Sequence, residues 1–150
     1  MTNKTKEERS FLAPSRWILI LLVMLLFGLG LAIRLYDITD LPLDFHPTRQ
    51  LFSALKARGM YYQTLPDIPE WQRDMALNQW KTKVTVEPPL LEILAVATYR
   101  FTGENLWVAR IYSIIFWLAG GVFLFSLAKE LTSRDGALAA LAFYLFLPYG

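Results

Sequence analysis

The sequence contains no cysteine and a single histidine. The absence of cysteine excludes disulfides, thiolate metal ligands and a cysteine nucleophile. The single histidine, His46, excludes a metal site built from several imidazoles. Charged residues make up only 19% of the chain, and the net charge is +2 without a dense basic cluster, so no nucleic-acid partner is indicated. These absences remove several classes of protein but indicate no compartment.

Hydrophobic residues, in contrast, are abundant and gathered in runs. They make up 55% of the sequence and aromatic residues 15%, which exceeds the apolar share of most soluble domains. The stretches 17–33 and 111–128 carry no charged or amide side chain, and basic residues bound each of them. A membrane span needs about 20 mostly apolar residues, and lengths from about 17 are tolerated. Both runs therefore predict transmembrane helices.

A cleaved signal peptide is the competing interpretation of the first run. Its apolar part usually has about 7–15 residues and ends at a small-residue cleavage site. Here the run is longer and ends in Ala32-Ile33-Arg34, so we expect a retained anchor. The tail 1–16 concentrates lysine and arginine beside this anchor, which predicts a cytoplasmic N-terminus.

The expected fold is an all-α, polytopic transmembrane helix bundle, with membrane lipids as partners. A cytoplasmic tail (1–16) precedes spans predicted at about 17–36, 88–102, 107–128 and 137–150, and the loop 37–87 lies on the outer face. The segment 88–102 is short and contains Glu92, so it fits either a thin, tilted span or a re-entrant piece. The last run reaches the end of the sequence, which predicts an N-terminal piece of a longer protein.

Two amphipathic juxtamembrane helices are expected within the long outer loop, because loops of this length are usually structured or functional. Pro47 suits a first helical position and Gly59 the residue after the last. In the second helix, Asp67 is expected to cap and Glu70 stands at capping-box distance. Four aromatic residues fit the headgroup level of a bilayer, unless the helices merely cover the bundle. These residues are Tyr61, Tyr62, Trp71 and Trp80.

The sharpest group of reactive side chains is Asp44 with His46, directly before the first loop helix. A carboxylate and an imidazole this close can provide a general base, a ligand for a divalent metal cation, or a helix cap. Histidine suits a base near neutral pH, because its unperturbed pKa is about 6.5. A divalent cation is therefore the one candidate cofactor.

Further charged residues suggest a phosphate site and a buried charge. Arg49 and Arg58 suit phosphate because a guanidinium offers bidentate donors, whereas Lys56 is expected on a solvated helix face. Glu92 and Arg110 stand near the ends of predicted spans, where an ionisable residue is a candidate functional group. They could pair with each other, and Glu92 could instead snorkel to the interface.

Several segments over 17–150 follow the layout of a known family. They are the loop start Leu41-Pro42-Leu43, an acidic site near Thr48-Arg49, Met60 at the loop-helix end, the Pro88-Pro89 pair, Tyr99-Arg100-Phe101-Thr102-Gly103-Glu104 and Ala109-Arg110-Ile111. This layout resembles family-39-type glycosyltransferases, which are membrane enzymes of the GT-C fold. That family includes protein O-mannosyltransferases and the aminoarabinose transferases of lipid A.

The resemblance implies a polyprenyl-phosphate sugar donor and an inverting transfer on the outer face of the membrane. The expected location is a prokaryotic cell membrane. It does not identify the sugar or the acceptor. Asp44 is then the base, with His46 assisting or replacing it. The donor phosphate is expected to bind the basic residues of the loop. These are Arg49, Arg58 and Lys83.

Two departures from the family pattern concern the expected site. The family's Asp-Glu pair falls either on Asp44-Phe45 or on His46-Pro47, and the second register leaves Asp44 as a shifted substitute. The lysine that often precedes the prolines corresponds here to Glu87, which makes Glu87 a further candidate. The rival hypothesis is a non-catalytic polytopic membrane protein, either a transporter subunit or a scaffold.

Overall fold

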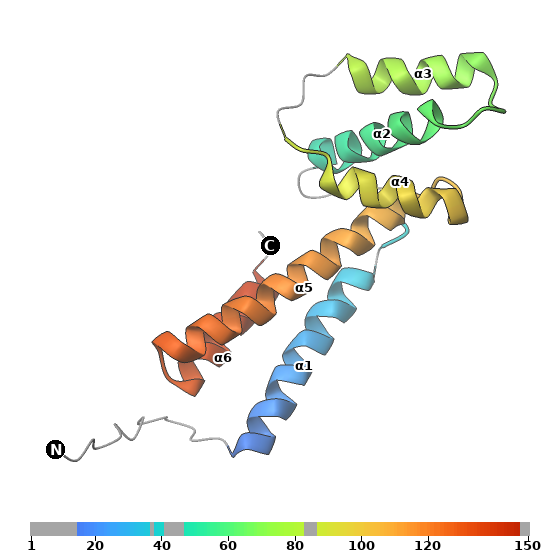
Figure 1. Cartoon of the computed structure of the whole chain (residues 1–150). Coiled ribbons are helices and arrows are strands. Elements are labelled where there is room, and N and C mark those ends of the chain that lie inside the picture. Colours follow the sequence, from blue (N-terminus) through green and yellow to red (C-terminus); the bar gives the residue numbers. More distant parts are fainter. Residues whose placement is uncertain (1–14, 37, 41–46, 83–86, 148–150) are drawn as a thin grey trace. The chain divides into compact units, whose positions relative to one another are not determined.

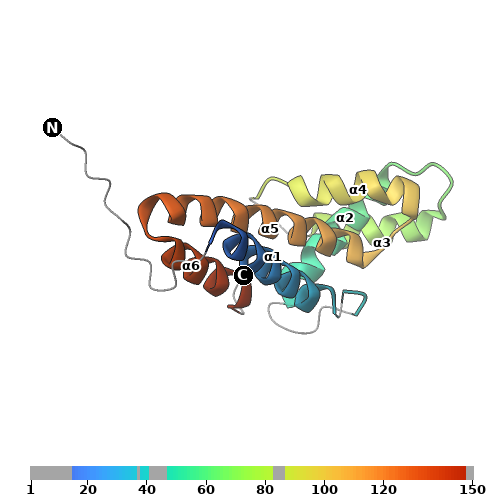
Figure 2. The ribbon, with the colours of Figure 1, turned by 90° about the horizontal axis from the view of Figure 1, so that it is seen from below.

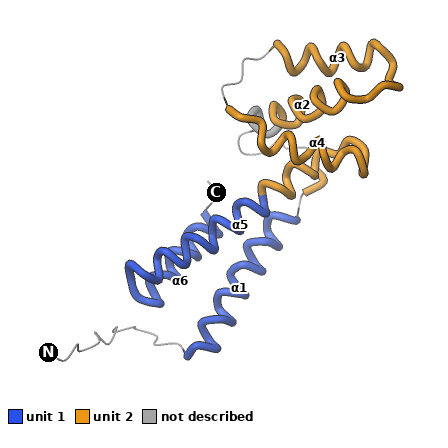
Figure 3. Tube along the Cα trace, viewed as in Figure 1, with its two compact units in different colours: residues 1–36, 114–150 blue, residues 37–113 orange. Residues whose placement is uncertain are grey.

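The structure is a computed structural model that describes residues 15–36, 38–40, 47–82 and 87–147, with the backbone alone for 47–50. Throughout these residues every regular element is a helix, which confirms the all-α expectation (Figure 1). The chain divides into two compact units, shown in Figure 3. The first unit combines 1–36 with 114–150, and the second unit is 37–113.

The first unit contains α1 (Arg16–Leu35), the later turns of α5 (Leu106–Leu131) and α6 (Arg134–Phe146). Serine side chains cap two of these helices: Ser15 Oγ accepts from the Ile18 N–H at 3.4 Å, and Ser133 Oγ accepts from the Gly136 N–H at 3.2 Å. Such caps satisfy N–H groups that have no partner within the helix. Helices α1 and α6 contact each other (Figures 1 and 2).

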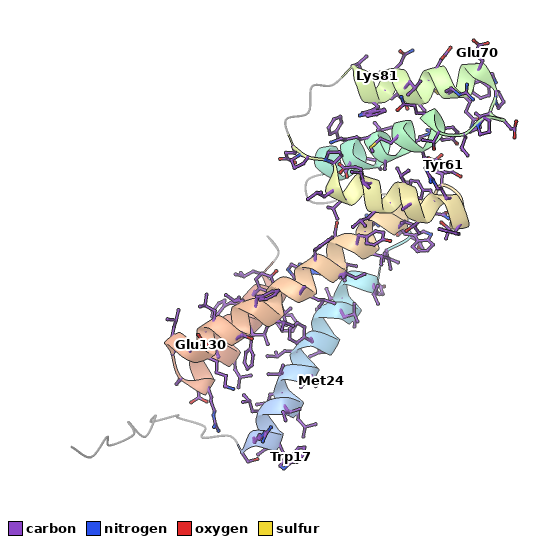
Figure 4. The ribbon with its side chains drawn as sticks, viewed as in Figure 1. Trp17, Met24, Tyr61, Glu70, Lys81 and Glu130 are labelled. Atoms are coloured by element: carbon purple, nitrogen blue, oxygen red, sulfur yellow. The ribbon has the colours of Figure 1, made fainter. Side chains whose placement is uncertain are left out.

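Two described helices are long and apolar enough to cross a membrane. Helix α1 has a mean hydropathy of 2.7 and α5 of 2.0, and only 11% of each apolar window is buried. Trp17 and Met24 are 76% and 68% exposed along α1 (Figure 4). Exposed apolar side chains fit a lipid environment better than the interior of a soluble domain. Helices α4 and α6 have 13 residues each, so spans at 88–102 and 137–150 stay predictions.

Small residues at Gly120 and Gly121 allow close packing in the first unit. A Cβ at Gly120 would stand 2.6 Å from the Tyr144 hydroxyl, and one at Gly121 would stand 3.2 Å from the Phe27 ring. The Tyr144 hydroxyl donates to the Trp117 carbonyl at 2.9 Å, and the two rings stack 5.4 Å apart. The missing side chains at both glycines therefore make room for aromatic rings.

The second unit contains α2 (Pro47–Gln63), α3 (Glu70–Lys81), α4 (Leu90–Thr102) and the first turns of α5. Helix α2 packs against both α3 and α4. The core of the second unit contains Ala57, Ala95, Tyr99 and Val108, each at most 2% exposed. Tyr61, labelled in Figure 4, meets the Tyr99 ring edge-on at 5.6 Å. Small residues on α2 and α4 bring these helices close, and aromatic rings fill the remaining space.

Helix α2 begins at Pro47 as predicted, but the prediction that it stops before Gly59 is wrong. The helix continues through Gly59 to Gln63. A Cβ at Gly59 would stand 2.7 Å from Trp80 Cβ and 3.1 Å from the Ala76 carbonyl. Glycine is needed here because α3 approaches closely, and not because the helix ends.

The expected cap of the second loop helix is also wrong. The N-cap of α3 is Pro69 and no side chain caps this end, so Asp67 does not do so. The Pro69 carbonyl accepts from the N–H groups of Gln72 and Arg73 at 3.0 and 3.2 Å. Glu70 still lies in the first turn, where its charge is favourable for the helix dipole.

The four aromatic residues expected at the headgroup level differ in exposure. Tyr62 is 8% exposed and contacts Tyr61 edge-on at 5.7 Å, so it belongs to the interior of the unit. Trp71 is 64% exposed on α3, beside Met75 at 46%. Trp80 lies against Gly59. Among the four, Trp71 keeps the exposure that a headgroup contact requires.

Candidate functional site

The predicted site residues fall into two groups, and one group lies outside the described residues. Asp44, His46 and Lys83 belong to it, as does the side chain of Arg49, whose backbone lies in the first turn of α2. Their assigned roles stay predictions. The remaining site residues, Arg58, Glu87, Glu92 and Arg110, all lie in the second unit.

A charged cluster joins α2 to the start of α4, and we call it the Lys56 cluster. Lys56 Nζ stands 3.9 Å from Glu92 Oε1, and the two side chains are 5% and 13% exposed. Ser53 Oγ donates to the same carboxylate oxygen at 3.0 Å. Lys56 Nζ also donates to the Glu87 carbonyl at 3.3 Å. The Lys56 cluster comprises Ser53, Lys56, Glu92 and this carbonyl.

The burial of Lys56 shows that the expected solvated helix face is wrong. Lys56 is 4% exposed and its Nζ contacts Glu92 of α4, so its side chain lies on the side of α2 that α4 covers. A buried ammonium is costly unless a charge and hydrogen bonds compensate it. Glu92 supplies the charge from the first turn of α4, where a carboxylate is also favoured by the helix dipole. The spacing of basic residues along α2 gave no signal of this arrangement.

The Lys56 cluster is suited to positioning rather than to reaction. Its polar atoms are engaged with one another, and they fix the segment before Pro88-Pro89 against α2. Glu87 itself is an exposed residue. The backbone contact therefore holds an exposed candidate site residue in place.

Glu92 and Arg110, which could have paired with each other, have separate partners in the structure. Glu92 pairs with Lys56. Arg110 Nη1 donates to the carbonyls of Ile38 at 2.9 Å and Asp40 at 2.7 Å. Arg110 therefore fastens the first residues of the unit to the first turns of α5.

Arg58, expected to bind phosphate, already has a carboxylate neighbour. Its Nε stands 3.4 Å from Glu104 Oε1, with side-chain exposures of 29% and 28%. The guanidinium also lies 5.4 Å from the centre of the Tyr62 ring. Burial raises the pKa of the Tyr62 phenol above its usual 10.0, and its hydrogen bond to Glu104 adds to the rise. A phosphate bound to Arg58 would have to share the cation with Glu104.

An open, mostly apolar groove of about 510 Å³ lies over the end of α2, beside α3 and α4. Arg100 is the one cation among its lining residues, and Gln63 and Thr64 are polar. Ile93, Ala97 and Phe101 recur along α4 at four-residue spacing, and this periodicity was the only signal of the groove in the sequence. The other lining residues are Met60, Trp80 and Val96.

No group of three or more His, Asp or Glu side chains within the described residues could hold a metal ion. The expected divalent cation depends on Asp44 and His46, which lie outside those residues. Metal binding therefore stays a prediction about that segment.

No protein-family model matches the sequence, and no curated protein or solved structure matches it. The class of protein is therefore defined by the structure itself. Its described residues form an all-helical chain, and two of the helices could span a membrane.

Proposed function

We propose that this protein is a membrane glycosyltransferase that uses a polyprenyl-phosphate-linked sugar donor on the outer face of the membrane. The observation that carries the proposal is the folded second unit between the two candidate spans. Residues that would only connect two spans need no core, whereas this unit has one, built from α2, α4 and the start of α5. Long, structured loops between rigid elements commonly hold functional sites.

The candidate catalytic residues directly precede this unit's first helix. Asp44 and His46 stand just before Pro47, where α2 begins. The Lys56 cluster joins that helix to the backbone of Glu87 at the start of α4. Two candidate segments, separated in the sequence, therefore belong to helices that buried contacts hold together. Such support is what a catalytic constellation requires to keep its geometry.

In the proposed reaction, Asp44 accepts a proton from an acceptor hydroxyl, with His46 assisting or replacing it. The acceptor oxygen then forms a bond to the anomeric carbon, and the bond from that carbon to the phosphate oxygen breaks. The electron pair leaves with the polyprenyl phosphate, and the configuration inverts. Arg49, Arg58 and Lys83 stabilise the negative charge of the leaving phosphate.

The test replaces Asp44 by Asn and His46 by Asn in the full-length membrane protein and follows donor turnover in native membranes. A general base contributes about 10²–10⁴-fold to the rate, so at least one variant should lose activity of that order. Asp40→Asn is the matched control, because the hydrogen bond from Arg110 goes to the Asp40 backbone carbonyl, which the substitution keeps. Unchanged turnover in both test variants would sink the assignment.

A non-catalytic membrane scaffold or transporter subunit is the second candidate. It is favoured by the internal pairing of charges in the second unit, where Lys56 pairs with Glu92 and Arg58 with Glu104. Buried pairs of this kind serve packing specificity as well as catalysis. A full-length protein that neither binds nor turns over a polyprenyl-phosphate sugar would favour this candidate.

A further inference from the structure

One face of α4 carries an apolar ridge that the described residues of the second unit leave exposed. Leu90 is 66% exposed, Ile93 49% and Phe101 91%, and Ala97 is exposed between them. Their spacing places them along one side of the helix. The opposite side, with Ala95, Val96 and Tyr99, is buried in the core. We call Leu90, Ile93, Ala97 and Phe101 the α4 ridge.

The α4 ridge is tied closely to a candidate span. Only Gly103, Glu104 and Asn105 separate α4 from α5, and three residues reach about 10 Å when extended. Val108 of α5 also packs into the core that α4 lines. If α5 spans a membrane, the end of α4 must therefore lie near the bilayer surface.

Helix α4 is too short to cross the bilayer unaided. Its 13 residues correspond to about 20 Å at 1.5 Å per residue, against a hydrocarbon core of about 30 Å. The Lys56 cluster also holds its first turn against α2. A short helix with one apolar side exposed fits the interface plane instead.

We propose that α4 lies in the membrane interface, with the α4 ridge inserted among the lipids of the bilayer that α1 and α5 cross. The α4 ridge then contacts lipids at the boundary between their headgroups and acyl chains. Arg100, exposed beside Phe101, places a cation where lipid phosphates lie. This inference concerns topology and does not depend on the proposed enzymatic activity.

The two arrangements of α4 differ in the side of the membrane that the turn after α5 faces. With α4 on the surface, α1 and α5 cross in opposite directions, and the turn after α5 returns to the side of the N-terminal tail. That turn carries Lys129 and Arg134, and the tail 1–16 is rich in lysine and arginine. Both basic segments then face the cytoplasm, whereas Arg100 and Arg110, which flank the turn between α4 and α5, stay on the outer side, so the count of basic residues does not by itself separate the two topologies. With α4 as a span, the same turn would face the opposite side.

Single cysteines in the naturally cysteine-free chain distinguish the two topologies. We would place them at three exposed positions, as Asp74→Cys on α3, Thr102→Cys at the end of α4 and Thr132→Cys after α5. A membrane-impermeant maleimide added outside intact cells should label the first two and spare the third. Labelling of Asp74→Cys and Thr132→Cys without Thr102→Cys would overturn the proposal.

A fluorescent probe on the α4 ridge tests the lipid contact itself. An environment-sensitive dye on Ala97→Cys, near the middle of α4, should be quenched more strongly by lipids with a shallow spin label than by lipids with a deep one. The matched control is the same dye on Asp74→Cys, which should be quenched weakly by both. Stronger quenching by the deep label would show a spanning helix, and no quenching would show protein covering the ridge. Either result contradicts an interfacial helix.

Discussion

Lys56 carries its charge where solvent barely reaches, at 4% exposure. An isolated ammonium in such a place would destabilise the fold. Here the Glu92 carboxylate and the Glu87 carbonyl compensate it, and Ser53 donates a hydrogen bond to the same carboxylate. The pair is therefore expected to matter most when only one partner is removed.

Lys56→Met should destabilise the protein by about 3 kcal/mol, because it leaves the Glu92 carboxylate buried without its cation. The double variant Lys56→Met with Glu92→Leu should recover most of that loss, since apolar replacements need no partner. Denaturant unfolding of the detergent-solubilised protein measures both effects. Equal losses in the single and double variants would contradict the assigned pairing.

Tyr62 should ionise at a higher pH than an ordinary tyrosine, because burial raises its pKa above 10.0 and Glu104 adds to the rise. The neutral phenol is the form that folding favours. The stability that it contributes is therefore complete below pH 10.0 and is lost as the pH rises through the higher folded pKa.

Absorbance titration of tyrosinate provides the measurement, with Tyr62→Phe identifying the component that belongs to this residue. The component that Tyr62→Phe removes should be the one that titrates at the higher pH. Glu104→Gln should move it to lower pH, because it removes the carboxylate charge that opposes ionisation. A Tyr62 component at the ordinary pH would show that the phenol is not buried.

The sequence could predict which residues carry charge near the site, but not their partners. Glu92 was expected near a membrane boundary, yet its contact with Lys56 depends on how α2 lies against α4. A single helix with mixed polar and apolar spacing does not indicate which face a distant helix will cover. The partner of Arg58 could not be predicted for the same reason, because Glu104 follows Arg58 in the sequence only after two further helices.

At the scale of elements, the clearest interhelical contact is the one at Gly59. Helix α3 approaches so closely that a Cβ would stand 2.7 Å from Trp80 Cβ. Gly59→Ala should therefore destabilise the second unit by about 1–3 kcal/mol, as overpacking does, although alanine normally favours a helix by about 1 kcal/mol.

Gly28→Ala in α1 is the matched control for this prediction. A Cβ there would meet nothing within 4 Å, so the substitution should be neutral or stabilising. Thermal unfolding of both variants, followed by tryptophan fluorescence, measures the difference. A stabilised Gly59→Ala variant would show that α2 and α3 are not this close.

The long apolar helices were predictable, whereas the ends of the loop helices were not. Runs without charge predicted α1 and α5 to within a few residues of their observed bounds, because apolar length is a strong signal. Gly59 was interpreted as a stop and Asp67 as a cap. In an isolated helix, glycine favours the C-terminal end and aspartate favours the N-cap. Here the close contact of Gly59 with α3 and the N-cap at Pro69 override these local preferences.

For the whole molecule, the candidate spans predict firm association with membranes. Leu25 is 56% exposed near the middle of α1. Leu25→Arg should weaken insertion by about 2.5–3.5 kcal/mol, the cost of arginine at the centre of a span. Extraction of membranes with alkaline carbonate measures the retained fraction.

Thr102→Arg is the control for membrane retention, since Thr102 is exposed and lies outside both candidate spans. It should remain in the membrane pellet like the unaltered protein. Release of the unaltered protein by carbonate would contradict the assignment of α1 and α5 as spans.

The two hydrogen bonds of Arg110 act as a ring closure. They join Ile38 and Asp40, just after α1, to the beginning of α5, and the chain between these points forms a closed loop. The cost of closing a loop rises only slowly with its length, by about 0.6 kcal/mol for each doubling. A peptide tag inserted in the turn between α2 and α3 would therefore lengthen this closed loop at little cost. The hydrogen bonds of Arg110 that close the loop would stay intact.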